Sequence, residues 1–69
     1  MAWKSLAEIA EEYKHNLAQL KARRDMLTAL LAHEADVNRR LNLRRRIVRI
    51  EHMIYSTATA LYAMEHRGG

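Results

Sequence analysis

The sequence predicts an all-α fold: an antiparallel two-helix hairpin in which all 69 residues form one domain. Two observations predict it. Residues 1–67 contain neither proline nor glycine, the two residues that most often interrupt a helix. Apolar residues also recur at alternating intervals of three and four in two stretches, and the register slips by about two residues between them. Such a slip favours two helices joined by a turn.

The first helix is predicted over about residues 6–33. Ser5 and Glu8 fit a capping box, in which the serine hydroxyl accepts from the Glu8 N–H and the Glu8 carboxylate accepts from the Ser5 N–H. The apolar seam that follows is interrupted once, at Arg24. Its members are Leu6, Ala10, Tyr13, Leu17, Leu20, Leu27 and Leu31.

The second helix is predicted over about residues 37–66, with Asp36 as its N-cap. Its seam is unbroken and consists of Leu43, Ile47, Ile50, Ile54, Thr57, Leu61 and Met64. Other apolar residues widen it, namely Val48, Tyr55, Ala58 and Tyr62 on one side and Met53 on the other. The apolar arc is therefore wider than contact with one neighbouring helix requires.

The turn is predicted near residues 33–36, because this segment contains no large apolar residue. It also contains no glycine, proline or asparagine to force the chain to reverse. One continuous helical rod is therefore the alternative that the sequence leaves open.

A chain this short buries too little surface to be stable alone without a disulfide, a structural metal or a partner. It has no cysteine, so self-association is the expected remedy. We expect a homodimer that forms a four-helix bundle, with docking on a different protein as the alternative. The candidate interface consists of Leu43, Ile47, Val48, Ile50, Ile54, Tyr55, Leu61 and Tyr62.

Positive charge is concentrated in the middle of the sequence. Residues 21–49 carry nine Lys and Arg against three acids, a net charge of +6, whereas residues 1–20 and 50–69 each sum to −1. A hairpin gathers these bases at the end that contains the turn, where they could bind RNA or DNA through phosphate. Solvated arginines paired with neighbouring acids are the alternative. The candidate polyanion-binding residues are Arg23, Arg39, Arg40, Arg44, Arg45, Arg46 and Arg49.

Two charged residues lie on the apolar faces, Arg24 in the first seam and Glu51 beside the second. We expect them to form a buried pair that fixes the register of a bundle. Glu12 and His15 have the spacing of a metal-binding pair, but the second helix places no acid opposite them, so no metal site is predicted.

No pattern typical of catalysis, a phosphate loop or a cofactor site is present, so we expect neither an enzyme nor a small-molecule substrate. No apolar run is long enough for a membrane span, and residues 1–5 do not resemble a signal peptide. The expected location is the cytoplasm. The leading hypothesis is a small interaction protein, and the second is a nucleic-acid-binding hairpin.

Overall fold

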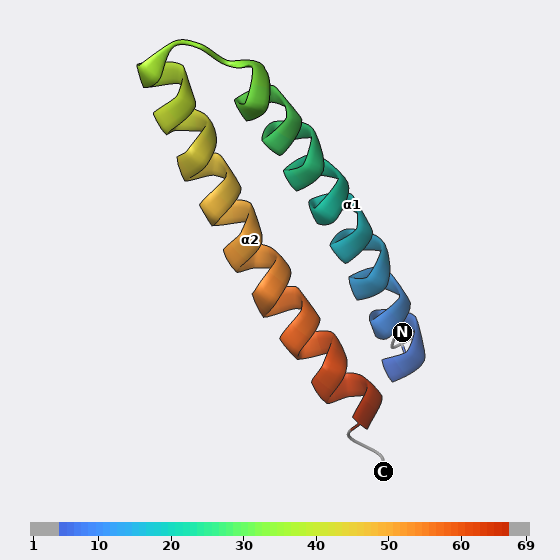
Figure 1. The fold of residues 1–69 in the computed structure, drawn as a ribbon. Coiled ribbons are helices and arrows are strands. Elements are labelled where there is room, and N and C mark those ends of the chain that lie inside the picture. Colours follow the sequence, from blue (N-terminus) through green and yellow to red (C-terminus); the bar gives the residue numbers. More distant parts are fainter. Residues whose placement is uncertain (1–4, 67–69) are drawn as a thin grey trace, which may run out of the picture.

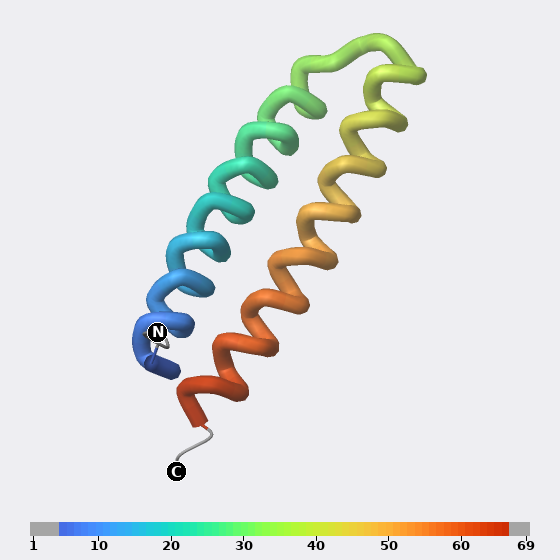
Figure 2. Tube along the Cα trace, turned by 180° about the vertical axis from the view of Figure 1, so that it is seen from behind, coloured from blue at the N-terminus to red at the C-terminus, as the bar shows by residue number. Residues whose placement is uncertain are grey.

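The computed structural model describes residues 5–66, which form two long helices and the turn between them. Helix α1 spans Leu6–His33 and α2 spans Val37–His66. The two helices run antiparallel along their whole length (Figure 1), and the view from behind shows the same arrangement (Figure 2). The predicted hairpin and its helix bounds are confirmed, and the continuous rod is wrong.

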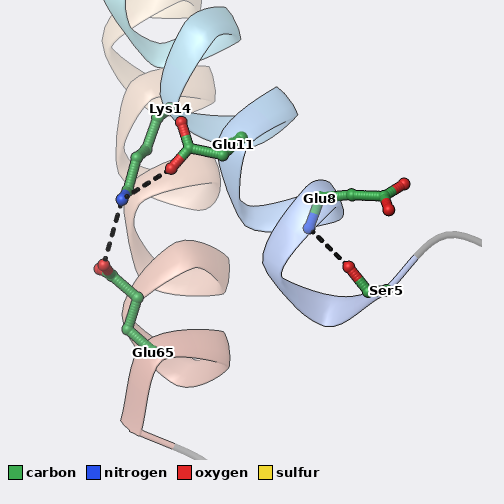
Figure 3. A network of polar contacts seen from close by, with 5 residues as sticks. All are labelled: Ser5, Glu8, Glu11, Lys14 and Glu65. Carbon is green, nitrogen blue, oxygen red and sulfur yellow. Dashed lines mark hydrogen bonds and ion pairs between the residues drawn. The ribbon is translucent and has the colours of Figure 1, made fainter.

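The start of α1 is capped by a side chain. The Ser5 Oγ accepts a hydrogen bond of 3.1 Å from the Glu8 N–H, while Ser5 itself stays in an extended conformation. This bond satisfies one of the N–H groups that a helix leaves without a partner in its first turn. The Glu8 carboxylate points away from Ser5 (Figure 3), so only the serine half of the predicted capping box is formed.

The turn consists of three residues, Glu34 to Asp36, and reverses the chain without glycine. Glu34 ends α1 by taking an extended conformation (φ −88°, ψ 123°). Asp36 then acts as the predicted N-cap of α2, since its Oδ2 accepts from the Arg39 N–H at 3.0 Å. No residue from 5 to 66 has a positive φ, so the turn needs no residue with the conformational freedom of glycine.

The side chains of Glu34 and Arg40 stabilise this turn by hydrogen bonds to backbone groups. The Glu34 Oε1 accepts from the Asp36 N–H at 3.1 Å. The Arg40 Nη1 donates to the carbonyl oxygens of Leu31 and Glu34, both at 2.9 Å. A cation at the C-terminal end of α1 also interacts favourably with the negative pole of that helix. Arg40 therefore connects the first turn of α2 to the last turn of α1.

The two predicted seams pack against each other as the core of the hairpin. Leu27 of α1 and Leu61 of α2 are the most buried side chains between residues 5 and 66, at 7% and 8% exposed. Leu6, the first seam position, remains 45% exposed. The other seam residues are half-buried, namely Ala10, Tyr13, Leu17, Leu20 and Leu31 in α1 and Leu43, Ile47, Ile50, Ile54, Thr57 and Met64 in α2. The core is one layer thick.

Candidate interaction surfaces

The end of the hairpin that contains the turn, here the closed end, carries the positive charge. Two of its arginines bond within the chain. Arg40 binds the carbonyls of the turn, as described above, and Arg24 donates to Asp25 Oδ1 from Nε and Nη2 at 3.2 and 3.1 Å. The predicted pairing of Arg24 with Glu51 is therefore not formed within the hairpin. Asp25 is next to Arg24 in the chain, whereas Glu51 is exposed on the other helix.

The remaining candidate arginines are exposed to solvent. Within residues 5–66 none of them forms an ion pair, and the acids Glu34 and Asp36 instead accept from backbone N–H groups of the turn. The closed end therefore keeps most of its excess positive charge on the surface. These arginines are Arg23, Arg39, Arg44, Arg45, Arg46 and Arg49.

One group of bases lines a groove between the two helices. A shallow hollow near the turn is lined by Leu30 and Glu34 on one side and by Arg39, Asn42, Leu43 and Arg46 on the other. A second hollow, lined by Arg23, Met26, Met53 and their neighbours, continues it toward the middle of the hairpin. Since Arg23 and Leu30 are one heptad apart in α1, and Arg46 and Met53 are one heptad apart in α2, both hollows lie on the same side. We call this surface the basic groove.

The predicted apolar interface divides into two parts. Leu43, Ile47, Ile50, Ile54 and Leu61 are buried or half-buried in the packing of α1 against α2. The others remain uncovered, with Val48 65%, Tyr55 71% and Tyr62 64% exposed. The hairpin therefore packs the seam of α2 against α1 and leaves the apolar residues at the edge of the arc, here called the exposed flank, open to solvent.

Leu41 belongs to the same exposed flank, at 46% exposed, although it was not among the predicted interface residues. The signal that could have found it is heptad spacing, because Leu41, Val48, Tyr55 and Tyr62 are each seven residues apart. These four residues form one row that winds slowly around α2, here called the apolar stripe. At 100° per residue, Leu41 and Val48 lie on the side of α2 away from Arg39 and Arg46, so the stripe and the basic groove occupy different sides of the hairpin.

At the open end of the hairpin, Lys14 connects the two helices. Its Nζ lies 3.3 Å from Glu11 Oε1 and 3.7 Å from Glu65 Oε2 (Figure 3). The hydrogen bond to Glu11, and then the negative charges of Glu11 and Glu65, raise the pKa of Lys14 above its usual value. All three side chains are exposed, so this contact contributes little to stability.

Three further properties of the chain concern metal binding, membrane spanning and similarity to known proteins. Between residues 5 and 66, no three histidine or acidic side chains are grouped so that they could hold a metal ion. In the same part of the chain, neither helix combines the length and the apolar character needed to cross a membrane. Comparison of the chain with family models, curated proteins and solved structures gives no match.

Proposed function

We propose that this chain is a small non-enzymatic interaction protein that pairs with a second copy of itself through the apolar stripe of α2. The product is a homodimer of four helices in which the two α2 helices lie side by side and antiparallel, each with its own α1 on the outer side, so it differs from the expected bundle with one shared core. The observation that carries the proposal is the stripe: four large apolar side chains, all at least 46% exposed, in one row on one helix. The row extends over about 32 Å at 1.5 Å per residue.

The surface area of the chain supports the need for a partner. A compact protein of 8.1 kDa has an accessible surface of about 4,500 Å². This chain exposes 5777 Å². The excess, about 1,300 Å², is larger than the roughly 800 Å² that each partner buries in a stable interface of standard size.

The order of residues along the stripe favours the antiparallel arrangement. The stripe begins with two aliphatic residues, Leu41 and Val48, and ends with two aromatic ones, Tyr55 and Tyr62. A two-fold axis between Val48 and Tyr55 would set each aliphatic side chain against a larger aromatic one, so that large and small side chains alternate across the interface. It would also keep the arginine-rich segments of the two copies at opposite ends of the interface, whereas a parallel dimer would place these like charges side by side.

Sedimentation equilibrium at micromolar concentration tests the dimer. The chain should sediment with twice its mass of 8.1 kDa. The uncharged double variant Val48→Gln/Tyr55→Gln should sediment as a helical monomer. The control Met26→Gln/Met53→Gln removes two exposed apolar residues from the other side and should remain dimeric. A folded monomeric wild type would overturn the proposal and favour docking on a different protein.

Crosslinking tests the antiparallel arrangement separately. The chain has no cysteine of its own, so single cysteines report single positions. Residue 51 lies near the expected two-fold axis, so Glu51→Cys should crosslink to its own copy with a short bis-maleimide. In the same dimer, two copies of residue 41 would lie about 30 Å apart, and Leu41→Cys should not crosslink. Efficient crosslinking at both positions would indicate a parallel dimer.

A further inference from the structure

We infer that the basic groove binds the phosphate backbone of nucleic acid. The inference is independent of the dimer, because the groove and the apolar stripe lie on different sides of the hairpin. Its starting point is the difference between the arginines that bond within the chain, Arg24 and Arg40, and those that have no ionic partner within residues 5–66.

The placement of these arginines is unfavourable for an isolated hairpin. Arg39 and Arg40 lie in the first turn of α2, where the positive pole of the helix disfavours bases, and the N-cap Asp36 is the acid at this pole. Arg40 is compensated by two carbonyls of the turn, but the exposed Arg39 is not. Charges that oppose local stability in this way are typical of binding sites.

The geometry fits a row of phosphates. Arg39, Asn42 and Arg46 follow each other at intervals of three and four, and so form one line along α2 in the hollow near the turn. This line is about 10 Å long, which matches about three successive phosphates of one strand at 3.4 Å each along the duplex axis. Arg23 of α1 and Arg46 of α2 contribute to the same groove from opposite walls. Planar guanidinium groups bind phosphate oxygens in a bidentate manner.

The uncharged residues of the groove distinguish nucleic acid from a lipid surface. Asn16 and Gln19 line it beside Arg23, and Asn42 lies between Arg39 and Arg46. Amide side chains donate hydrogen bonds to phosphate and sugar oxygens, whereas a face inserted into lipid excludes them. No aromatic residue lines either hollow, so base stacking contributes nothing. Binding should therefore be independent of sequence and strongly dependent on salt.

Fluorescence anisotropy with mixed-sequence DNA and RNA duplexes tests the inference, since the two probes distinguish which backbone is preferred. We expect the logarithm of the binding constant to fall with the logarithm of salt concentration with a slope of about −2.7, as for three phosphate contacts made by Arg23, Arg39 and Arg46. The variant Arg39→Gln/Arg46→Gln should lose about tenfold in affinity and reduce the magnitude of the slope by about 1.8. Removing Arg39 also takes a positive charge away from the positive end of α2. We therefore expect the variant to stay folded, so that a loss of binding reflects lost phosphate contacts.

The matched control is Lys21→Gln/Arg44→Gln, which removes the same charge from two exposed residues on the other side of the hairpin. It should keep the wild-type slope. Absence of binding to both duplexes at about 50 mM salt would overturn the inference, as would equal losses in the two variants. Binding to anionic phospholipid vesicles in place of either duplex would also overturn it. The monomeric Val48→Gln/Tyr55→Gln variant should keep the per-chain slope, so failure of the dimer is distinguishable from failure of the groove.

Discussion

The closed and open ends of the hairpin are held by different kinds of interaction. At the closed end, Glu34, Asp36 and Arg40 direct their side chains at backbone N–H and carbonyl groups. At the open end, Lys14 is held between two exposed carboxylates, those of Glu11 and Glu65. Backbone groups have fixed positions, whereas exposed ion pairs are mobile and are screened by salt.

This difference explains how one end can be both rigid and highly charged. The side chains that fix the turn use backbone partners, so the stability of the turn does not require its arginines to be neutralised. The open end carries little excess charge, because its acids and bases largely compensate each other. The position of its two helices depends on packing in the apolar seam. Variants at the two ends should therefore behave differently, in the following order of effect.

The largest effect is expected in the core, where Leu27 and Leu61 are almost equally buried in opposite halves of the hairpin. Replacing either with alanine should cost about 2–4 kcal/mol of unfolding free energy through lost burial and a residual cavity. Urea denaturation followed by circular dichroism, at a fixed chain concentration, measures this cost. Amide hydrogen exchange should show that Leu61→Ala releases the open end first, whereas Leu27→Ala lowers protection throughout. Identical protection patterns would contradict the distinction between the two ends.

A smaller effect is expected at the turn. Arg40→Gln removes two charge-assisted hydrogen bonds to the carbonyls of Leu31 and Glu34 and should cost about 1.5–3 kcal/mol. Its neighbour provides the control, since Arg39→Gln removes the same charge from an exposed side chain and should change stability by less than about 0.5 kcal/mol. Urea denaturation compares the two directly. Equal losses would show that charge, and not the bonds of Arg40, stabilises the closed end.

The smallest effect is expected at Lys14 and should depend on pH. The pKa of Lys14 is raised in the folded chain by Glu11 and then Glu65. Its stabilising contribution is therefore complete below the ordinary lysine pKa of 10.5, and it is lost as the pH rises through the higher pKa of the folded state. Thermal unfolding of wild type and Lys14→Gln should differ slightly at neutral pH and converge in strong alkali. A difference that persists there would assign the effect to packing of the lysine stem.

The fold could be predicted from the sequence because its determinants are local or periodic. Ser5 and Asp36 mark the two helix starts, and the slip between two regular seams locates the turn. The role of Arg40 could not be predicted this way, because its carbonyl partners come within reach only after the chain has reversed. From the sequence, Arg40, Arg44 and Arg46 are equal candidates for binding a polyanion.

The candidate interface was predictable only in part, for a related reason. Ile50 and Tyr55 belong to one apolar arc on α2. The part of that arc that α1 covers cannot be predicted from the sequence. The structure assigns Ile50 to the hairpin and leaves Tyr55 71% exposed. Likewise, the basic groove depends on Arg23 and Arg46 facing the same side, and this relation is set by the pairing of the two helices.

The turn without glycine has a consequence for the recognition and design of other helical chains. Its reversal is encoded by a pattern of side chains, Glu34-x-Asp36-x-x-x-Arg40, in which each member bonds to a backbone group at the junction. Ala35 is exposed and keeps a negative φ, so that position should accept almost any residue. The same seven-residue pattern could be transferred between two designed helices as a compact connector, with the reversal fixed by hydrogen bonds in place of a flexible residue.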